Sequence, residues 1–144
     1  MPYATLQDLI DRDPEGQNGL LVLADRDGDG VVDQVVVDRA LADASAEIDG
    51  YLAAGGYSLP LSPVPSVLRS LCCDIAIWRL AKGPMLATEE RRQRYQDAVR
   101  LLDRISAGAV SLGPSDGGEA AATASRASFS ARARRFGAGR RFEA

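Results

Sequence analysis

Hydrophobic positions recur every three or four residues along much of the chain, which is the spacing that places side chains on one face of an α-helix. Three stretches show this pattern most clearly, at residues 37–51, 68–78 and 95–105. Their hydrophobic members are Val37, Leu41, Ala44, Ile48 and Tyr51, then Leu68, Leu71, Cys72, Ile75 and Trp78, then Tyr95, Ala98, Val99, Leu102 and Ile105. We therefore predict three long helices, each with one apolar side.

Helix start and stop signals set the bounds of these helices. Asp33 and Thr88 have the side chains preferred at the N-cap, and they precede the first and the third stripe. The glycine pair at 55–56 and Gly108 stand where the first and third helices should end. The second helix is expected over about 65–81.

Two shorter segments precede the long helices. Thr5 can cap a first short helix with Asp8 at its third position, and residues 20–24 are expected to form one or two helical turns. Residues 56–65 contain three prolines, which favour an extended loop. The predicted fold is all-α, a small bundle of three long helices plus one or two short ones, with an extended C-terminal tail.

Charge and composition change after residue 112. Residues 1–112 hold 11 basic and 17 acidic side chains, whereas residues 113–144 hold six arginines, three acids and many small residues. The second stretch has too little apolar content to fold by itself. We therefore predict a helical domain at 1–112 and a basic tail at 113–144 that becomes ordered only on a partner.

The tail has candidate partner-binding residues, which are Arg126, Phe129, Arg132, Arg134, Arg135 and Phe136. Arginines interleaved with phenylalanines are typical of nucleic-acid binding, where the rings stack on bases. They are also typical of protein binding, where arginines pair with carboxylates and rings fill pockets. A solvated tail without a partner is the third interpretation. The acidic charge of residues 1–112 favours a protein partner, because that surface would repel DNA.

The composition argues against an enzyme and against a membrane protein. The chain has no histidine, a single lysine and no phosphate-binding loop of the Walker type, so common catalytic groups are missing. No apolar run approaches the roughly 18 residues that would suggest a membrane span. The adjacent Cys72 and Cys73 cannot easily form a disulfide with each other, and we expect reduced, partly buried thiols.

The segment DRDGDGVVDQVV at residues 25–36 has the spacing of a calcium-binding loop. Its candidate ligands are the carboxylates of Asp25, Asp27, Asp29 and Asp33 and the backbone carbonyl of Val31. However, the twelfth position carries a valine in place of the usual bidentate glutamate. Any calcium binding should therefore be weak, with a dissociation constant on the order of 10⁻⁴–10⁻³ M.

A second interpretation of the same segment needs no metal. Aspartate side chains accept hydrogen bonds from nearby amides in turns, and Gly28 and Gly30 permit positive φ angles. Asp33 would then serve only as a helix cap. An acid from another segment, Asp11, Asp13 or Glu15, could complete a metal site, but the sequence alone does not place one there.

Several motifs occur in series, in the order YATLQDLIDR, LADRDGDGVVD, RALADASAEIDGYL, GYSLPL and RYQDAVRLLDRISAGAVSLG. Between the last two lies a helix that carries a cysteine and Asp74. This string resembles the Mu-type family of head–tail connector proteins of tailed phages and prophages. The resemblance covers residues 3–113, whereas the tail segment ASFSARARRF agrees only roughly with the basic, Phe-containing ends of that family.

The resemblance implies a structural, non-enzymatic adaptor made in the bacterial cytoplasm and placed in the virion at the head–tail interface. Such proteins form a ring beneath the portal, commonly of twelve copies, and bridge the capsid to the tail. The implied partners are the portal protein ring, neighbouring copies, a downstream tail or stopper protein, and DNA that passes through the lumen without sequence-specific contact. The alternatives are a small calcium-binding helical module with a partner-binding tail and, less favoured by the acidic body, a DNA-binding accessory protein.

Overall fold

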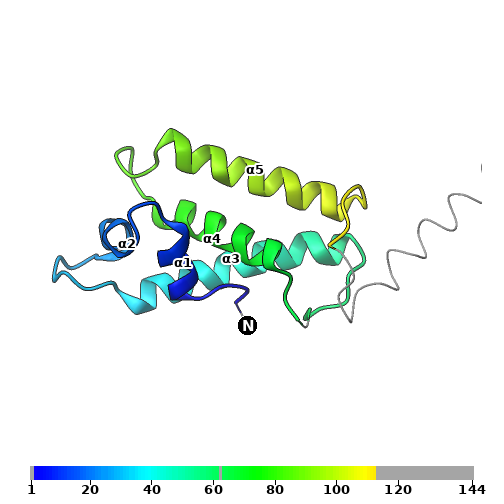
Figure 1. The fold of residues 1–144 in the computed structure, drawn as a ribbon, viewed down its shortest axis with the longest axis horizontal. Coiled ribbons are helices and arrows are strands. Elements are labelled where there is room, and N and C mark those ends of the chain that lie inside the picture. Colours follow the sequence, from blue (N-terminus) through cyan, green and yellow to red (C-terminus); the bar gives the residue numbers. More distant parts are fainter. Residues whose placement is uncertain (1, 62, 113–144) are drawn as a thin grey trace, which may run out of the picture.

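The computed structural model describes residues 2–61 and 63–112, and every regular element in these ranges is a helix. The five helices are α1 (Leu6–Arg12), α2 (Gln17–Ala24), α3 (Gln34–Ala54), α4 (Ser66–Leu80) and α5 (Glu89–Ser106). Three are long and two are short, so the predicted all-α bundle is confirmed (Figure 1).

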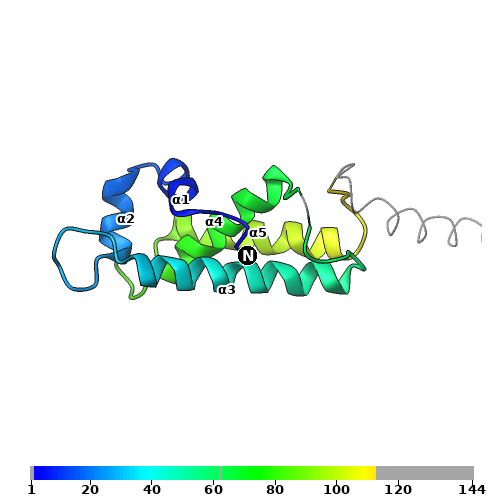
Figure 2. The same cartoon turned by 90° about the horizontal axis from the view of Figure 1, so that it is seen from below.

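Helix α4 is the centre of the bundle. It packs against each of the other four helices, and nine of its residues are buried. Figure 2 shows α1 and α2 on one side of α4 and α3 on the other. The wide apolar face of the α4 sequence explains this position, because a helix with neighbours on several sides needs apolar residues around most of its circumference.

Local capping explains where the helices begin and end. The Thr5 hydroxyl accepts from the Asp8 amide while the Asp8 carboxylate accepts from the Thr5 amide, which is the expected capping box. Thr88 caps α5 as predicted, since its hydroxyl accepts from the Arg91 amide. After α3 the chain turns at Gly56, where φ is +85°, and the Tyr57 amide donates to the Leu52 carbonyl at 3.0 Å.

Two polar links tie the helices together across the apolar core. The Arg12 guanidinium of α1 donates to both carboxylate oxygens of Asp74 on α4, at 3.1 and 2.9 Å, and Asp74 is only 7% exposed. Glu47 of α3 accepts from Arg79 at 2.6 Å and from the Tyr95 hydroxyl at 3.1 Å. Glu47 therefore joins α3, α4 and α5 at one point.

The two cysteines are free thiols, as expected, but both are fully buried in the core rather than partly buried. Burial raises the pKa of Cys72, and burial together with the charge of Cys72 raises the pKa of Cys73 to about 12. Both groups are therefore neutral thiols in the folded protein near pH 7. Within the described part of the chain, none of the helices is long and apolar enough to cross a membrane.

Candidate functional site

The aspartate-rich loop connects α2 to α3 and extends beyond the helices at one end of the molecule (Figures 1 and 2). Asp25 organises its first half. One oxygen of Asp25 accepts from the amides of Gly28 at 2.8 Å and Asp29 at 3.2 Å, and the other accepts from the Gly30 amide at 2.9 Å. The glycines adopt φ angles of +78° and +82°, in the region that favours glycine, as the sequence predicted.

Three of the five predicted ligand residues come together in this loop. Carboxylate oxygens of Asp25, Asp27 and Asp29 lie within 4.8 Å of one another. Asp33 has a different role, because its carboxylate accepts from the Arg26 amide at 2.8 Å. Val31 is 63% exposed, and its amide donates to Asp29 at 2.9 Å. Asp33 does precede α3 as predicted, but its side chain makes no cap hydrogen bond to that helix, which corrects the expected side-chain cap.

The three clustered carboxylates have different electrostatic surroundings. Hydrogen bonds from the amides of Gly30 and Gly28 lower the pKa of Asp25 below its ordinary value. The Asp29 amide acts in the same direction on Asp27, but desolvation and the charge of Asp29 outweigh it, so the pKa of Asp27 is raised. A bound cation would relieve this repulsion at Asp27, whereas Asp25 is already stabilised as an anion by the backbone.

The loop geometry suits both interpretations of the sequence. Each of Asp25, Asp27 and Asp29 accepts at least one backbone hydrogen bond, as an aspartate turn requires. The three oxygens also stand close enough for one cation to contact them all. None of the candidate completing acids belongs to this cluster in the described residues, and Asp13 and Glu15 line a separate groove instead.

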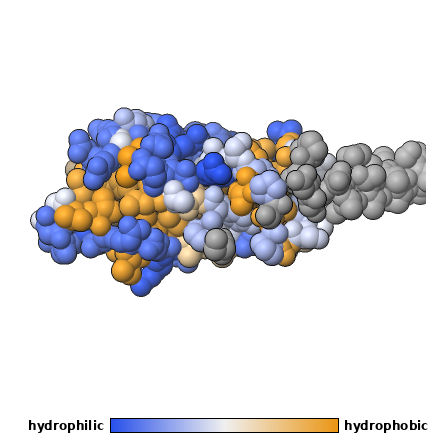
Figure 3. All heavy atoms as spheres, turned by 60° about the horizontal axis from the view of Figure 1, so that its bottom comes forward, coloured by the Kyte–Doolittle hydropathy of each residue, from blue (hydrophilic) through white to orange (hydrophobic). Residues whose placement is uncertain are grey.

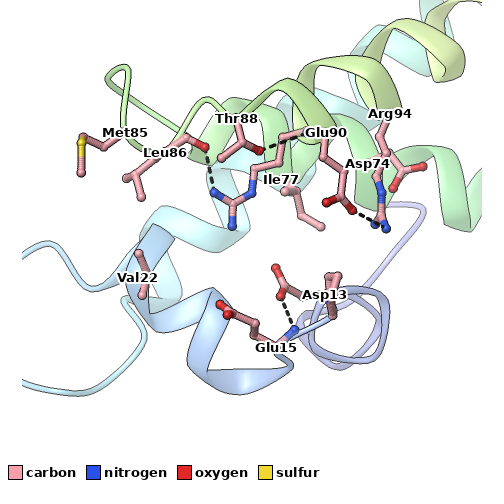
Figure 4. Close-up of a pocket in the computed structure, with 12 residues that line it drawn as sticks. Asp13, Glu15, Val22, Asp74, Ile77, Met85, Leu86, Thr88, Glu90 and Arg94 are labelled. Carbon is pink, nitrogen blue, oxygen red and sulfur yellow. Dashed lines mark hydrogen bonds and ion pairs between the residues drawn. The ribbon is translucent and has the colours of Figure 1, made fainter.

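That groove, which we call the acidic groove, has a volume of about 400 Å³. It is bounded by Asp13 and Glu15 between α1 and α2, by Val22 of α2, and by Met85 with the start of α5 (Figure 4). Val22 is 62% exposed and Met85 is 88% exposed. Large apolar side chains at the mouth of a hollow are typical of a surface that binds another molecule.

Among the described residues, only three of the six charged side chains that line the acidic groove have an oppositely charged partner, and one of these is Asp74, which pairs with Arg12. Glu90 pairs with Arg94 at 3.0 Å, and the Arg91 guanidinium donates to the Leu86 carbonyl at 2.8 Å. Asp13 accepts from the Glu15 amide at 2.8 Å and lies so close to Gly19 that a Cβ there would come within 2.3 Å of its oxygen. Asp13, the exposed Glu15 and Arg91 have no oppositely charged partner in the described part of the chain, so two unpaired acids and one unpaired cation line the groove.

Sequence reasoning did not find the acidic groove. Its residues come from four separate segments, and periodicity places each segment without showing which ones meet. Its exposed apolar side chains gave no signal either, because Val22 lies between Leu21 and Leu23 and Met85 is followed by Leu86. The tail candidates Arg126, Phe129, Arg132, Arg134, Arg135 and Phe136 lie outside the described residues, so their predicted roles remain predictions.

Comparisons with known proteins place the chain among phage proteins. The family model described as Bacteriophage Mu, Gp36 matches residues 3–131. The Mu-like prophage FluMu protein gp36 of Haemophilus influenzae is 48% identical over 88 residues, which cover 61% of this chain and 60% of that protein. Gene product J of Escherichia phage Mu is 41% identical over 113 residues, which cover 78% of this chain and 77% of that protein.

Proposed function

This chain belongs to the bacteriophage Mu Gp36 family, and on that premise we propose that it is a structural head–tail connector. It forms a ring under the portal, bridges the capsid to the tail, and surrounds DNA that passes through without sequence-specific contact. The observation that carries the proposal is the family match over residues 3–131, which extends through the helical body into the basic tail. The proposal includes no enzymatic activity, and it places the protein in the virion at the head–tail interface.

The charge of the helical body supports a role around moving DNA. Residues 1–112 carry 17 acidic and 11 basic side chains. A negative surface repels the phosphate backbone, so DNA can slide past without being held.

The tail supplies the contact with the portal in this proposal. Arg132, Arg134 and Arg135 pair with carboxylates of the portal, and Phe129 and Phe136 fill apolar pockets there as anchors. Arg126 adds a further charge contact at the start of this segment. A downstream tail or stopper protein would bind the opposite side of the ring.

Electron microscopy of the full chain mixed with the portal from the same gene cluster tests the proposal. We expect a ring seated on the portal. A chain that ends after Leu112 should no longer dock but should keep its helical circular dichroism. A matched control replaces Arg140 and Arg141 by glutamine, which lowers the tail charge outside the proposed contact. Docking by the shortened chain would refute the role of the tail, and no ring from the full chain would refute the connector.

A small calcium-binding module with a partner-binding tail is the second candidate. The observation that favours it is the approach of Asp25, Asp27 and Asp29 to within 4.8 Å of one another. Repeating the microscopy with calcium and with chelator separates the candidates. A ring that survives in chelator would show that assembly needs no metal in the loop. Loss of the ring in chelator would show that the loop is a metal site of the assembly.

A further inference from the structure

A hollow of about 120 Å³ lies on another side of the molecule, between the start of α3 and the C-terminal end of α4. Four cationic side chains line it, from Arg26, Arg39, Arg79 and Lys82, together with one acid, Asp43. We call it the basic hollow. Such a concentration of positive charge stands out in a body whose acids outnumber its bases.

Three of these four cations have no partner within residues 2–61 and 63–112. Arg79 pairs with Glu47 at 2.6 Å, but the side chains of Arg26, Arg39 and Lys82 make no hydrogen bond or ion pair there. Four other arginines of the body do pair with acids, namely Arg12, Arg92, Arg94 and Arg100. The basic hollow therefore holds positive charge that is not neutralised within the described part of the chain, and it would attract an anionic group.

Apolar surface adjoins the basic hollow. Val36, Ala40 and Leu80 contribute to its lining, and Val35 beside it is 69% exposed. Figure 3 shows hydrophobic side chains gathered at the end of the molecule that holds α2, the aspartate loop and the start of α3. A partner that binds here should therefore present carboxylates next to apolar side chains, which would bury both kinds of surface together.

The acidic groove offers that combination on a different side of the helical body. Asp74 and Ile77 line the acidic groove, whereas Arg79 and Leu80 line the basic hollow. At about 100° per residue, Asp74 and Arg79 lie about 140° apart around α4, whereas Ile77 and Leu80, three residues apart, lie only about 60° apart. Figure 2 shows that α1 and α2 flank α4 on one side and that α3 flanks it on the other, so the acidic groove, which includes α2, and the basic hollow, which includes α3, lie on different sides of the body.

We propose that the basic hollow of one copy binds the acidic groove of the next copy. Arg39 and Lys82 of one copy then approach Glu15 of its neighbour, and the exposed Val35 meets the exposed Val22 and Met85. Two complementary patches on different sides of one molecule form a head-to-tail contact, which generates a ring when the rotation closes. The inference rests on the proposed connector function and names the surfaces that would build its ring.

A protein partner fits the basic hollow better than DNA does. Asp43 lines the hollow, and the loop that carries Arg26 also carries the exposed Asp27 and Asp29. A duplex is wide and densely charged, so these neighbouring carboxylates would repel it. One or two carboxylates on a protein surface can reach the cations without meeting that repulsion.

Sedimentation of the full chain at low salt tests the pairing. Protein concentrations up to about 1 mM reach the effective concentrations found in assemblies. Wild type should self-associate, and added salt should weaken the association. Arg39→Glu with Lys82→Glu reverses the charge of the basic hollow. Val22→Lys with Glu15→Lys reverses the charge of the acidic groove. Each pair should weaken association by at least about tenfold, because like charges then face each other. All four substituted positions are exposed, so the core is untouched.

Complementation makes the test specific. A mixture of the two reversed proteins, or one chain with all four substitutions, should recover association because opposite charges meet again. Arg69→Glu with Arg104→Glu is the matched control for the hollow variant, since both double changes remove two cations and add two acids, and its positions are exposed and away from both surfaces. Circular dichroism of each variant checks its folding.

The outcomes separate the pairing from the ring. Recovery of association by complementation supports the pairing. An assembly that stops at two copies would still support the pairing but would count against the ring. A wild type that stays monomeric, or reversed variants that associate like the control, would overturn the pairing, even if rings still form on a portal. Loss of DNA binding in the hollow variant with unchanged self-association would also overturn it, in favour of a phosphate site.

Discussion

Asp74 of α4 and Asp25 of the loop before α3 are both held by hydrogen bonds, but from different sources. Asp74 is 7% exposed and receives its bonds from the guanidinium of Arg12, 62 residues away in sequence. Asp25 lies near the surface and receives its bonds from amides three to five residues away. The first aspartate joins two helices, whereas the second shapes only its own turn. Removing them should therefore have unequal consequences.

The largest loss of stability is expected from Arg12→Ala. It leaves the buried carboxylate of Asp74 without its cation, which should lower the free energy of unfolding by about 3 kcal/mol. Urea denaturation followed by circular dichroism measures this loss. Arg69→Ala is the control, because Arg69 is an exposed cation with no ion pair among the described residues, and its effect should stay within about 0.5 kcal/mol. Equal effects of the two changes would show that water solvates Asp74 adequately.

A smaller loss is expected from Glu47→Ala, which removes the acceptor shared by Arg79 and Tyr95. Arg79 is 40% exposed, and solvent weakens that pair, so we expect about 1–2 kcal/mol. Glu47→Gln can still accept from Tyr95 and should lose less. Burial, together with the charge of Glu47, also raises the pKa of Tyr95. An ultraviolet titration should therefore show a lower Tyr95 pKa in the alanine variant, and an unchanged pKa would contradict the contact.

The body was predictable because its signals are local. Thr5 and Thr88 cap helices through bonds to residues three positions later, and Gly56 ends α3 through bonds within one turn. The hydrophobic stripes placed the long helices for the same reason. The pair between Arg12 and Asp74 could not be predicted, because it depends on how α1 packs across α4.

The candidate site also has a part that local sequence predicts and a part that only tertiary packing determines. Asp25, Asp27 and Asp29 converge because they share one short loop, so their spacing alone indicated the cluster. The carboxylate of Asp33 turns toward Arg26, which the sequence did not indicate because both a cap and a ligand fit its position. The acidic groove and the basic hollow combine separate segments, so only the packed helices reveal them.

Within the loop, Asp25→Asn should lower the melting temperature, whereas Asp27→Asn should not. Asp25 uses both oxygens as acceptors, and an amide nitrogen in place of one would face the Gly30 amide, so its melting temperature should fall at pH 7. Asp27 accepts at one oxygen only and has a raised pKa, so its neutral substitute should leave the melting temperature unchanged or higher. Thermal unfolding followed by circular dichroism compares the two.

The pH dependence follows from the same pKa shifts. The lowered pKa of Asp25 means that its stabilising contribution is present above its unfolded pKa of about 4 and is lost as the pH falls through its folded pKa. Asp27 has the opposite sign, since its raised pKa disfavours the folded state as the pH rises above the unfolded pKa of about 4, and this destabilisation is complete once the pH exceeds the folded pKa. Asp25→Asn should therefore flatten the acid side of the stability profile. A profile unchanged by that substitution would show that the amide bonds do not hold the carboxylate in solution.

Calcium should have the smallest effect. The twelfth loop position is Val36, so a cation would have the clustered carboxylates but no bidentate ligand, and binding should be weak. We expect the melting temperature to rise slightly at about 10 mM calcium, and Asp27→Asn to abolish the rise. Magnesium is the control, because it demands a tighter octahedral geometry. Suppose that calcium produces no shift in the melting temperature while Asp25→Asn still destabilises the protein. Hydrogen bonds from backbone amides then explain the loop aspartates without a metal, and Asp25 differs from Asp74 only in the source of its hydrogen bonds.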